Sequence, residues 1–544
     1  MKKIYVLLML VAGFSATRLT AQWTNIGTSG FSPGQASSIS FALDTNGTPY
    51  VAFQDNDSSS KISVMKFTGG SWSLVGARGF SPYEADYVSL AMAADGTPYV
   101  GFSDNGGNGS GPGSKQVIVM KYNGSTWVNV GAPDFSAVEA DFISLAFDHN
   151  GVLYVAYYDN ATFSPTIKKF NGSAWVDVGI QITTSISAND ISLAIDNNNV
   201  PLVAFSDGST GHKASVIKYN GSTWVNVGAA GFTPDAAYYT SLTIAPDGTP
   251  YIAFEDANDT LKASVMKFNG SNWVFVGAEG FSIGEQVQFL DIAIDPCGTP
   301  YVTYQDNGTI DYSNITVNKF NGSNWVIVGQ AAFSTSGSAY NNIVLDKFGT
   351  PMVAYQDVEY SNKVSVEIFP TLAGIPSVAA SNTTICSGGA ATLSISSGNL
   401  NQASNWHWYS TSCGGTPAGT GTSVQVSPTN STTYYVRGEG TCVASSCANI
   451  QITVNTCNGI AGVDANDLKL YPNPAGEQVT LEGDILSGGN YQLIISDITG
   501  RLVAPDFKRG TNTAVINTSS LSPGIYLVSL KTGDNTISKK LIKE

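Results

Sequence analysis

The sequence predicts an all-β protein whose larger part is a seven-bladed β-propeller made of four-stranded blades. A segment of the type Phe-Asn-Gly-Ser-x-Trp-Val recurs about every fifty residues, a period typical of propeller blades or solenoid turns. Each copy contains four short runs typical of β-strands. The array also begins with a lone strand and ends with a copy that lacks one. The tryptophans that mark the period are Trp23, Trp72, Trp127, Trp175, Trp224, Trp273 and Trp325.

The copy from Tyr239 to Gly277 shows how the four strands follow one another. Its expected strands are residues 240–245, 251–254, 264–268 and 273–277. A Pro-Asp-Gly-Thr-Pro turn joins the first two strands, and Asn269-Gly270 joins the last two. We expect the Asn-Gly pair to form a type I′ hairpin, in which both central residues have positive φ.

The two ends of the array predict how the propeller closes. Trp23 to Gly27 resembles a fourth strand that has no blade in front of it, and the last copy stops after its third strand, residues 364–369. We expect the N-terminal strand to pair with this third strand and close the ring, because closure leaves only short protected edges. A solenoid would instead need polar caps at both ends.

Composition limits the class of protein. Only 12% of the 544 residues are charged, glycine is abundant (57 residues) and the formal net charge is −15. Nucleic acid binding needs clustered Lys and Arg, so this composition argues against that partner.

A basic start, an apolar run over residues 4–14 and small residues up to Ala21 predict a signal peptide, residues 1–21. The run is too short to span a bilayer, so we expect an exported mature chain without a transmembrane segment.

The turns at the two faces of the propeller differ in length. Turns between first and second strands and between third and fourth strands are short and stereotyped, whereas crossovers between blades and second-to-third loops are long and variable. Binding residues belong on variable loops carried by a rigid scaffold. We therefore expect any ligand at the crossover face, with the candidate residues Tyr83, Glu84, Asp86, Glu139, Asp141, Asp190 and Tyr238. Tyr87, Tyr239 and Tyr340 are further aromatic residues near the crossovers.

The candidate carboxylates precede the innermost strands and should surround the mouth of the axial channel. Close like charges favour cation capture or a raised pKa, so Asp86 and Asp141 are candidate calcium ligands. No other cofactor is expected. The same carboxylates could instead be ordinary solvated loop charges.

An aspartate ends the second strand of every copy, and two interpretations are open for it. These residues could hold calcium or a ligand, or their side chains could bond loop amides, which their presence in every blade favours. They are Asp55, Asp104, Asp159, Asp207, Asp256, Asp306 and Asp357.

Residues 375–456 change in character. The Trp period stops and cysteines cluster, namely Cys386, Cys413, Cys442, Cys447 and Cys457, whereas Cys297 lies in the repeats. The cluster predicts a local disulfide framework whose connectivity the spacing leaves open. A zinc site is the weaker alternative, because only His407 is near and the spacing fits no zinc pattern. With Cys386-Ser-Gly-Gly, Trp408-Tyr409 and Thr433-Tyr-Tyr-Val436, the segment resembles bacterial immunoglobulin-like domains, which implies a β-sandwich spacer.

Residues 467–544 hold an ordered set of motifs at the end of the chain. They are Tyr471-Pro472-Asn473-Pro474, an Asp-x-x-Gly-Arg turn at Gly500, a Gly-x-Tyr strand at Gly524 and Tyr526, and a basic terminal strand. This segment resembles the type A C-terminal sorting domain of the type IX secretion system. The resemblance implies interaction with that machinery and export through the periplasm to the outer surface of a Gram-negative bacterium or beyond.

These observations lead to a functional hypothesis. We expect a secreted or surface-anchored binding or adhesion protein whose propeller, residues 22–370, presents a face to a glycan or a surface protein. The chain has no Gly-x-Ser-x-Gly elbow, His-Glu-x-x-His motif or phosphate loop, so we expect no enzymatic activity. Two alternatives stay open: an extracellular propeller glycosidase or lyase that uses the axial carboxylates, and a purely structural surface-layer repeat protein.

Overall fold

The computed structural model describes residues 22–106, 115–136, 139–180, 188–307, 313–334, 337–370, 375–398, 400, 403–440, 446–455, 468–487, 491–532 and 535–544. The predicted signal peptide lies outside these residues. Within the described ranges, no helix combines the length and the apolar character that a membrane span requires.

The first four blades are antiparallel four-stranded sheets. Blade 1 consists of β2 (Ala36–Leu43), β3 (Pro49–Asp55), β4 (Lys61–Thr68) and β5 (Ser71–Leu74). Blade 2 consists of β6 (Ala85–Met92), β7 (Pro98–Asp104), β8 (Gln116–Tyr122) and β9 (Trp127–Asn129). Blade 3 consists of β10 (Ala140–Phe147), β11 (Leu153–Asp159), β12 (Ser164–Phe170) and β13 (Trp175–Asp177). Blade 4 consists of β14 (Ala188–Ile195), β15 (Pro201–Asp207), β16 (Lys213–Tyr219) and β17 (Trp224–Asn226).

The remaining blades complete the ring. Blade 5 consists of β18 (Ala237–Ile244), β19 (Pro250–Asp256), β20 (Lys262–Phe268) and β21 (Trp273–Phe275). Blade 6 consists of β22 (Val287–Ile294), β23 (Pro300–Asp306), β24 (Asn314–Phe320) and β25 (Trp325–Ile327). Blade 7 consists of β26 (Ser338–Leu345), β27 (Pro351–Asp357), β28 (Lys363–Ile368) and the N-terminal β1 (Thr24–Asn25). Short 3₁₀ turns follow three second strands: η1 (Asn56–Ser58), η2 (Gly208–Thr210) and η3 (Ala257–Asp259).

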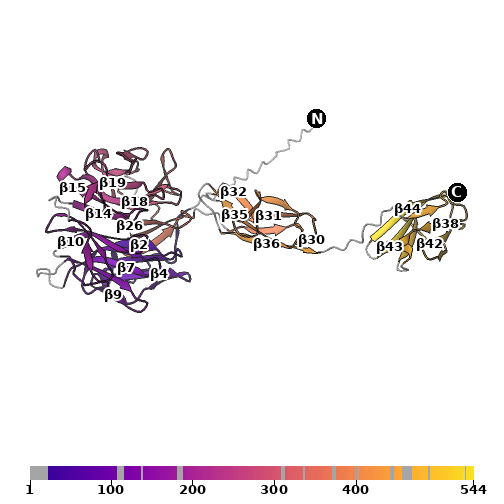
Figure 1. Ribbon diagram of the computed structural model, residues 1–544, viewed down its shortest axis with the longest axis horizontal. Coiled ribbons are helices and arrows are strands. Elements are labelled where there is room, and N and C mark those ends of the chain that lie inside the picture. Colours follow the sequence, from indigo (N-terminus) through magenta and orange to yellow (C-terminus); the bar gives the residue numbers. More distant parts are fainter. Residues whose placement is uncertain are drawn as a thin grey trace, which may run out of the picture. The chain divides into compact units, whose positions relative to one another are not determined.

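The predicted closure is confirmed. β1 pairs antiparallel with β28, so that Thr24 lies opposite Ile368 and Asn25 opposite Glu367. First strands of neighbouring blades contact one another around the ring, and β2 contacts β26 across the closure. In Figure 1, the first strands β2, β14, β18 and β26 lie toward the middle of the propeller, whereas β4 and β9 lie nearer its margin.

The recurring tryptophans join neighbouring blades. Each indole Nε1–H donates a hydrogen bond of 2.6–2.9 Å to a main-chain carbonyl of the preceding blade; Trp127, for example, bonds Val75 and Trp23 bonds Val328 across the closure. Trp127 also stacks on Phe80 with ring centroids 4.1 Å apart. A buried indole needs a partner for its N–H, so these contacts explain why the tryptophans recur.

A second set of contacts closes a ring near the axis. In each first strand, one Ser, Asp or Asn side chain accepts a hydrogen bond from a main-chain N–H of the next blade, at 2.9–3.4 Å. The acceptors are Ser40, Ser89, Ser144, Ser192, Ser241, Asp291 and Asn342. Because Asn342 bonds Phe41 of blade 1, this ring also passes through the closure.

The hairpins between third and fourth strands differ from the prediction. Gly270 has φ of +96°, but Asn269 does not have positive φ, so the turn is not type I′. The Asn269 side chain instead accepts hydrogen bonds from the main-chain N–H groups of Ser271 and Asn272. An Asx-type side-chain bond therefore replaces the expected backbone geometry.

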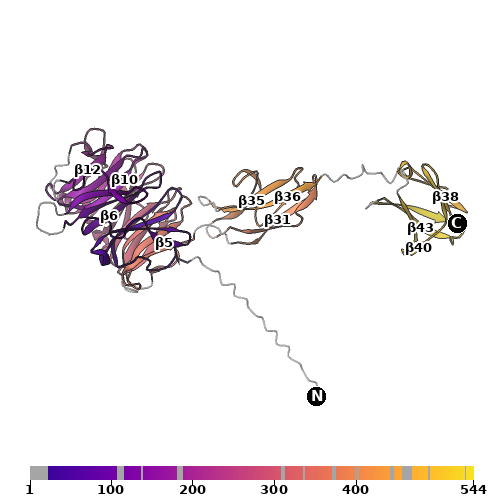
Figure 2. The same ribbon diagram turned by 90° about the horizontal axis from the view of Figure 1, so that it is seen from below.

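The immunoglobulin-like domain contains two sheets (Figure 2). One holds β29 (Ser377–Ala380), β31 (Ala391–Ser397) and β34 (Ser423–Val426). The other holds β30 (Thr384–Cys386), β36 (Ala448–Asn455), β35 (Thr432–Glu439), β32 (Asn405–Ser410) and β33 (Thr416–Thr420), in that order. Trp408 is fully buried and donates its indole N–H to the carbonyl of Gly421. Cys413 and Cys447 form a disulfide.

The C-terminal domain also contains two sheets. One has the order β37 (Lys469–Tyr471), β38 (Gln478–Glu482), β42 (Thr513–Asn517), β41 (Phe507–Arg509), and η5 (Asp484–Leu486) follows β38. The other has the order β40 (Leu502–Val503), β39 (Gln492–Asp497), β43 (Gly524–Thr532), β44 (Asn535–Lys543). Their shared core includes Val479, Ile516, Val528 and Leu541.

The sequence motifs of this domain have structural roles. The Asn473 side chain donates to the carbonyl of Lys540 at 2.7 Å and accepts from the N–H of Ile542 at 2.8 Å, which holds the terminal strand. Gly500 has φ of +85° in the turn that Asp497 caps. Tyr526 is buried and bonds the carbonyl of Ser522.

Candidate ligand-binding site

Every first strand of the propeller carries a β-bulge near its start. The register shifts between Asp86 and Ser89 in blade 2, and at the matching place in the other blades. One residue of each bulge has a left-handed backbone, with φ between 45° and 55°. These seven bulge residues are Ser38, Tyr87, Phe142, Asp190, Tyr239, Phe289 and Tyr340. Bulges commonly redirect a side chain toward a site.

The bulge residues meet around one cavity of ≈ 260 Å³, here called the axial pocket. The residues that follow them in the strands, such as Ile39, Val88 and Leu290, line it as well. Because all seven first strands contribute, the pocket lies on the axis of the propeller.

Five of the seven bulge residues are aromatic and form two arcs. Tyr239 and Phe289 have ring centroids 5.5 Å apart, and Phe289 and Tyr340 4.8 Å apart. Tyr87 and Phe142 form the second arc at 5.1 Å. All five side chains are half-buried, as expected for the wall of an open cavity rather than for a closed core.

The fold does not require aromatic residues at this position. Ser38 and Asp190 occupy it with the same backbone conformation. A left-handed backbone costs a non-glycine residue roughly 1–2 kcal/mol, and such strain gathers at functional sites. Five bulky side chains are therefore held in a strained conformation that smaller residues also satisfy.

Asp190 supplies the charge among the described residues that line the axial pocket. Its Oδ2 accepts a hydrogen bond from the main-chain N–H of Tyr239 at 2.7 Å. Burial raises the pKa of Asp190 to about 6, and His212 partly offsets this rise. Glu255 on β19 is 3% exposed, and burial raises its pKa to about 7, with a further contribution from Asp190.

A polar group also remains unsatisfied in the pocket wall. Asn341 is 3% exposed and lines the pocket. Its Nδ2 donates to the carbonyl of Phe289 at 2.7 Å, whereas its Oδ1 is buried and makes no hydrogen bond within the described structure. Leaving such an acceptor buried without a partner costs stability.

The predicted carboxylates partly gather here. Asp86, Asp141 and Asp190 lie close enough to Tyr87 that, together with burial, they raise its pKa. The first strands start earlier than expected, so these aspartates lie within β6, β10 and β14 rather than before them. Of the candidate residues, Asp190 lines the axial pocket, whereas the others lie outside its wall.

Side-chain amides bond both oxygens of Asp86 and one oxygen of Asp141, whose Oδ1 is buried without a partner among the described residues. Asp86 accepts hydrogen bonds from Gln54 Nε2 at 2.9 Å and from Asn105 Nδ2 at 2.7 Å, and Asp141 accepts one from Asn160 Nδ2 at 3.0 Å. The described residues form no group of three or more His, Cys, Asp and Glu side chains suited to a metal ion. Calcium binding stays a prediction.

The other candidate residues lie on the crossovers. Glu84 is exposed, and the side chain of Tyr83 is 50% exposed. Glu139 forms an ion pair with Lys115 at 3.0 Å, and Tyr238 packs near His212 with ring centroids 6.4 Å apart. No contact with a ligand follows from these positions alone.

The sequence analysis did not single out Phe142 and Phe289. It assigned Tyr87, Tyr239 and Tyr340 to the crossovers rather than to a position that recurs in each blade. All five recur at one position, two residues before the Ser, Asp or Asn that bonds the next blade. Aligning the copies on that polar residue would have revealed them.

The aspartates that end the second strands have structural roles. Asp207 accepts hydrogen bonds from the N–H of Ser209 at 3.0 Å and from Ser215 Oγ at 2.8 Å. Asp55 is fully buried and forms a bidentate ion pair with Arg78. These contacts support the loop-capping interpretation over the ligand interpretation.

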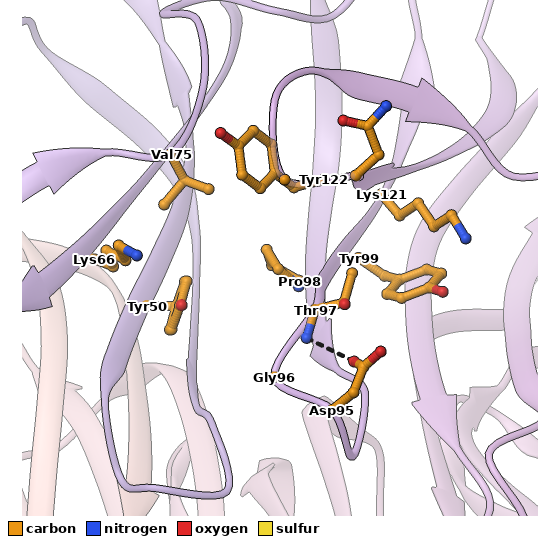
Figure 3. A pocket seen from close by; sticks show the side chains of 12 residues that line it. Tyr50, Lys66, Val75, Asp95, Gly96, Thr97, Pro98, Tyr99, Lys121 and Tyr122 are labelled. Carbon is orange, nitrogen blue, oxygen red and sulfur yellow. Dashed lines mark hydrogen bonds between the residues drawn. The ribbon is translucent and has the colours of Figure 1, made fainter.

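A larger cavity, ≈ 460 Å³, lies between blades 1 and 2 on the face of the short turns. Figure 3 shows Tyr50 and Lys66 of blade 1 on one side and Tyr122 of blade 2 pointing toward them, whereas Tyr99 and Lys121 point to the other side; below them Asp95 accepts a hydrogen bond from the N–H of Thr97. The Lys and Tyr pair recurs in other blades, as the ammonium groups of Lys267 and Lys319 over the rings of Tyr251 and Tyr301 show. Because its wall repeats, this cavity is explained by the blade architecture.

The comparisons with known proteins identify the two C-terminal domains. Residues 469–544 match the secretion system C-terminal sorting domain, and residues 374–455 match the Ig-like domain described as CHU_C associated. The predicted resemblance to type IX secretion cargo with an immunoglobulin-like domain is confirmed. No curated protein matches the chain.

Several solved structures resemble the propeller at low sequence identity. A polysaccharide lyase of family PL25, an ulvan lyase, has 12% identity and a TM-score of 0.43, with 64% of this chain and 94% of that chain covered. An α-L-arabinanase of Penicillium chrysogenum has 12% identity and a TM-score of 0.38, with 64% and 97% covered. The Aleuria aurantia lectin has 14% identity and a TM-score of 0.37, with 56% and 97% covered. The ligands and substrates named for these proteins are not assigned to this chain.

Proposed function

We propose that this chain, a type IX secretion cargo by its C-terminal domain, is an extracellular or surface-attached glycan-binding protein whose propeller holds the sugar in the axial pocket. The sorting domain directs the chain out of the cell. Carbohydrate is the abundant ligand outside a bacterium, and a pyranose ring has an apolar face of C–H groups that packs on aromatic rings.

The aromatic bulge residues carry this proposal. Tyr239, Phe289 and Tyr340 form a half-buried wall around an open cavity, at positions where the fold also accepts Ser and Asp. Aromatic walls with a few polar groups are typical of small-molecule sites. Asp190 and Asn341 provide those polar groups.

The test is a glycan-array screen of residues 22–544, followed by calorimetry with the best ligand. Phe289→Leu should weaken binding by about tenfold, because the flat aromatic face on which the sugar ring packs is lost. Phe163→Leu is the matched control. Phe163 is 52% exposed and shares the left-handed backbone, but it lies on a second-to-third loop outside the pocket.

Two results would contradict the proposal. One is an array on which no glycan binds above background. The other is an equal loss of affinity in the Phe163 and Phe289 variants, which would place the sugar elsewhere.

Cleavage of the bound glycan is a second candidate, because burial raises the pKa of both Asp190 and Glu255 toward neutrality. Such pKa values suit a general acid. Binding is favoured over cleavage because glycosidases need two carboxyl groups that flank one bond, and Asp190 lines the axial pocket whereas Glu255 does not. Product analysis of any bound oligosaccharide, with Glu255→Gln as the variant, distinguishes the two.

A further inference from the structure

The aromatic wall of the axial pocket is interrupted by a single acid. Asp190 stands between Phe142 of blade 3 and Tyr239 of blade 5 in the ring of bulge residues. The N–H of Tyr239 fixes its Oδ2, and its main-chain carbonyl accepts a hydrogen bond from Thr240 Oγ1 at 2.6 Å. The carboxylate is thus held in place beside aromatic rings.

No cation pairs with Asp190 in the described part of the chain. Arg78 pairs with Asp55, Lys115 with Glu139 and Lys168 with Asp177. His212 is the basic group close enough to act on Asp190, and it lies in the loop after β15. Asp190 is half-buried in the pocket wall, so its carboxylate can meet a ligand, and no Lys or Arg of the described residues pairs with it.

The groups around Asp190 add negative charge. Glu255 on β19 and Asp86 and Asp141 at the starts of β6 and β10 all act on the tyrosines of the ring. Lys115 is the opposing charge near Tyr87, and it is already paired with Glu139. This field disfavours uronic acids and sulfated sugars, and it favours a cation.

Aromatic faces next to a carboxylate are the setting in which proteins bind ammonium groups. A cation over an aromatic ring gains electrostatic attraction from the π-system, and the gain increases when the site is desolvated. A neutral sugar would leave the carboxylate of Asp190 without a cation. A sugar with a free amine would satisfy both the rings and the acid.

We propose that the axial pocket recognises a hexosamine with a free amino group, whose ring packs on Tyr239 and Phe289 and whose ammonium pairs with Asp190. This inference rests on the proposed glycan binding and names the class of sugar.

The test compares sugars that carry a free amine, an acetylated amine or a hydroxyl at the same ring position. Calorimetry on residues 22–544 at pH 6.5, where most of the free amines are protonated, uses glucosamine trimer, N-acetylglucosamine trimer and a neutral glucose trimer. The glucosamine trimer should bind about tenfold more tightly than the acetylated trimer, and added salt should reduce the difference. Free lysine, an amine without a sugar ring, should bind far more weakly.

Two variants separate the contributions of the acid and the rings. Asp190→Asn should abolish the preference for the amine while leaving the affinity for the acetylated trimer unchanged. Phe289→Leu should weaken all the trimers to a similar extent. Asp235→Asn, which changes an exposed acid at a neighbouring crossover, is the matched control and should keep the preference.

The outcomes distinguish this inference from the proposed function. Equal affinity for the amine and the acetylated trimer, or a preference that survives in Asp190→Asn, overturns the amine inference but leaves glycan binding standing. Binding of lysine as tight as that of the glucosamine trimer overturns the sugar part. If none of the trimers and no glycan of the array binds, glycan binding itself is wrong.

Discussion

At the scale of single residues, Asp190 occupies a position that recurs in every blade, but the fold does not require a carboxyl group there. It shares its backbone conformation with five aromatic residues, and its carboxyl group lies beside their rings. Burial raises its pKa to about 6, which means that the folded state holds the proton more tightly than the unfolded chain. A residue that costs stability at neutral pH is expected where binding rather than folding selects it.

The first residue-scale prediction concerns stability and pH. Since the folded pKa is above the unfolded value of about 3.9, the contribution of Asp190 to stability is lost as pH rises from about 4 to about 6. Asp190→Asn should therefore raise the free energy of unfolding at pH 7.5 by about 1–3 kcal/mol and change it little at pH 4. Urea unfolding of both proteins at the two pH values measures this difference.

The control for that measurement is Asp235→Asn, because Asp235 is exposed. Glu255 and Asp291 also have raised pKa values, so the pH dependence of the parent protein's free energy of unfolding combines the titration of several groups. The difference in free energy of unfolding between the parent protein and Asp190→Asn isolates the contribution of Asp190. A difference that is the same at pH 4 and pH 7.5 would contradict the assignment.

At the scale of elements, the short strand β1 links the two ends of the array. Thr24 and Asn25 complete blade 7, and Trp23 donates its indole N–H to Val328 of blade 6. Without β1, strand β28 would present an unpaired edge, and such edges promote association between chains. Two paired residues and one indole therefore protect a whole blade.

Deleting residues 22–28 tests this role. The shortened protein should melt at a lower temperature than the chain that starts at residue 22, and it should aggregate on concentration. Light scattering and calorimetry measure both effects, and Trp23→Phe separates the loss of the indole bond from the loss of the strand. A monodisperse product with an unchanged melting temperature would mean that closure does not depend on β1.

At the scale of the whole molecule, the sorting domain and the propeller are separate folding units. In the sorting domain, Asn473 makes two hydrogen bonds to the main chain of the terminal strand β44, at Lys540 and Ile542, so the motif at the start of the domain holds the end of the chain. The propeller closes through its own strands, with β1 and β28 in one sheet. Its folding therefore does not draw on the sorting domain.

A chain that ends at Asn455 tests this division. It should accumulate in the periplasm as a soluble, folded protein, because the signal peptide still acts while the sorting domain is missing. Cell fractionation, with limited proteolysis as the test of folding, measures the result against the full chain. Normal amounts of the shortened protein outside the cell would contradict the sorting role.

Much of the architecture is determined by the sequence itself. The period of the tryptophans, the Asn-Gly hairpins and the missing last strand predict seven blades and their closure, because these signals are local and recur in each copy. The motifs around Asn473 and Tyr526 predict the sorting domain for the same reason. Even the structural role of the strand-end aspartates follows from their presence in every blade.

Only the tertiary structure decided where the axial pocket forms. Tyr87, Phe142, Asp190, Tyr239 and Phe289 are about fifty residues apart along the chain, and the ring brings them together at the axis. Their side chains face the axis because a bulge shifts each first strand, and a bulge leaves little trace in strand periodicity. The sequence therefore determined the scaffold through local patterns, whereas the pocket depends on the register of seven bulges, which exists only once the ring has closed.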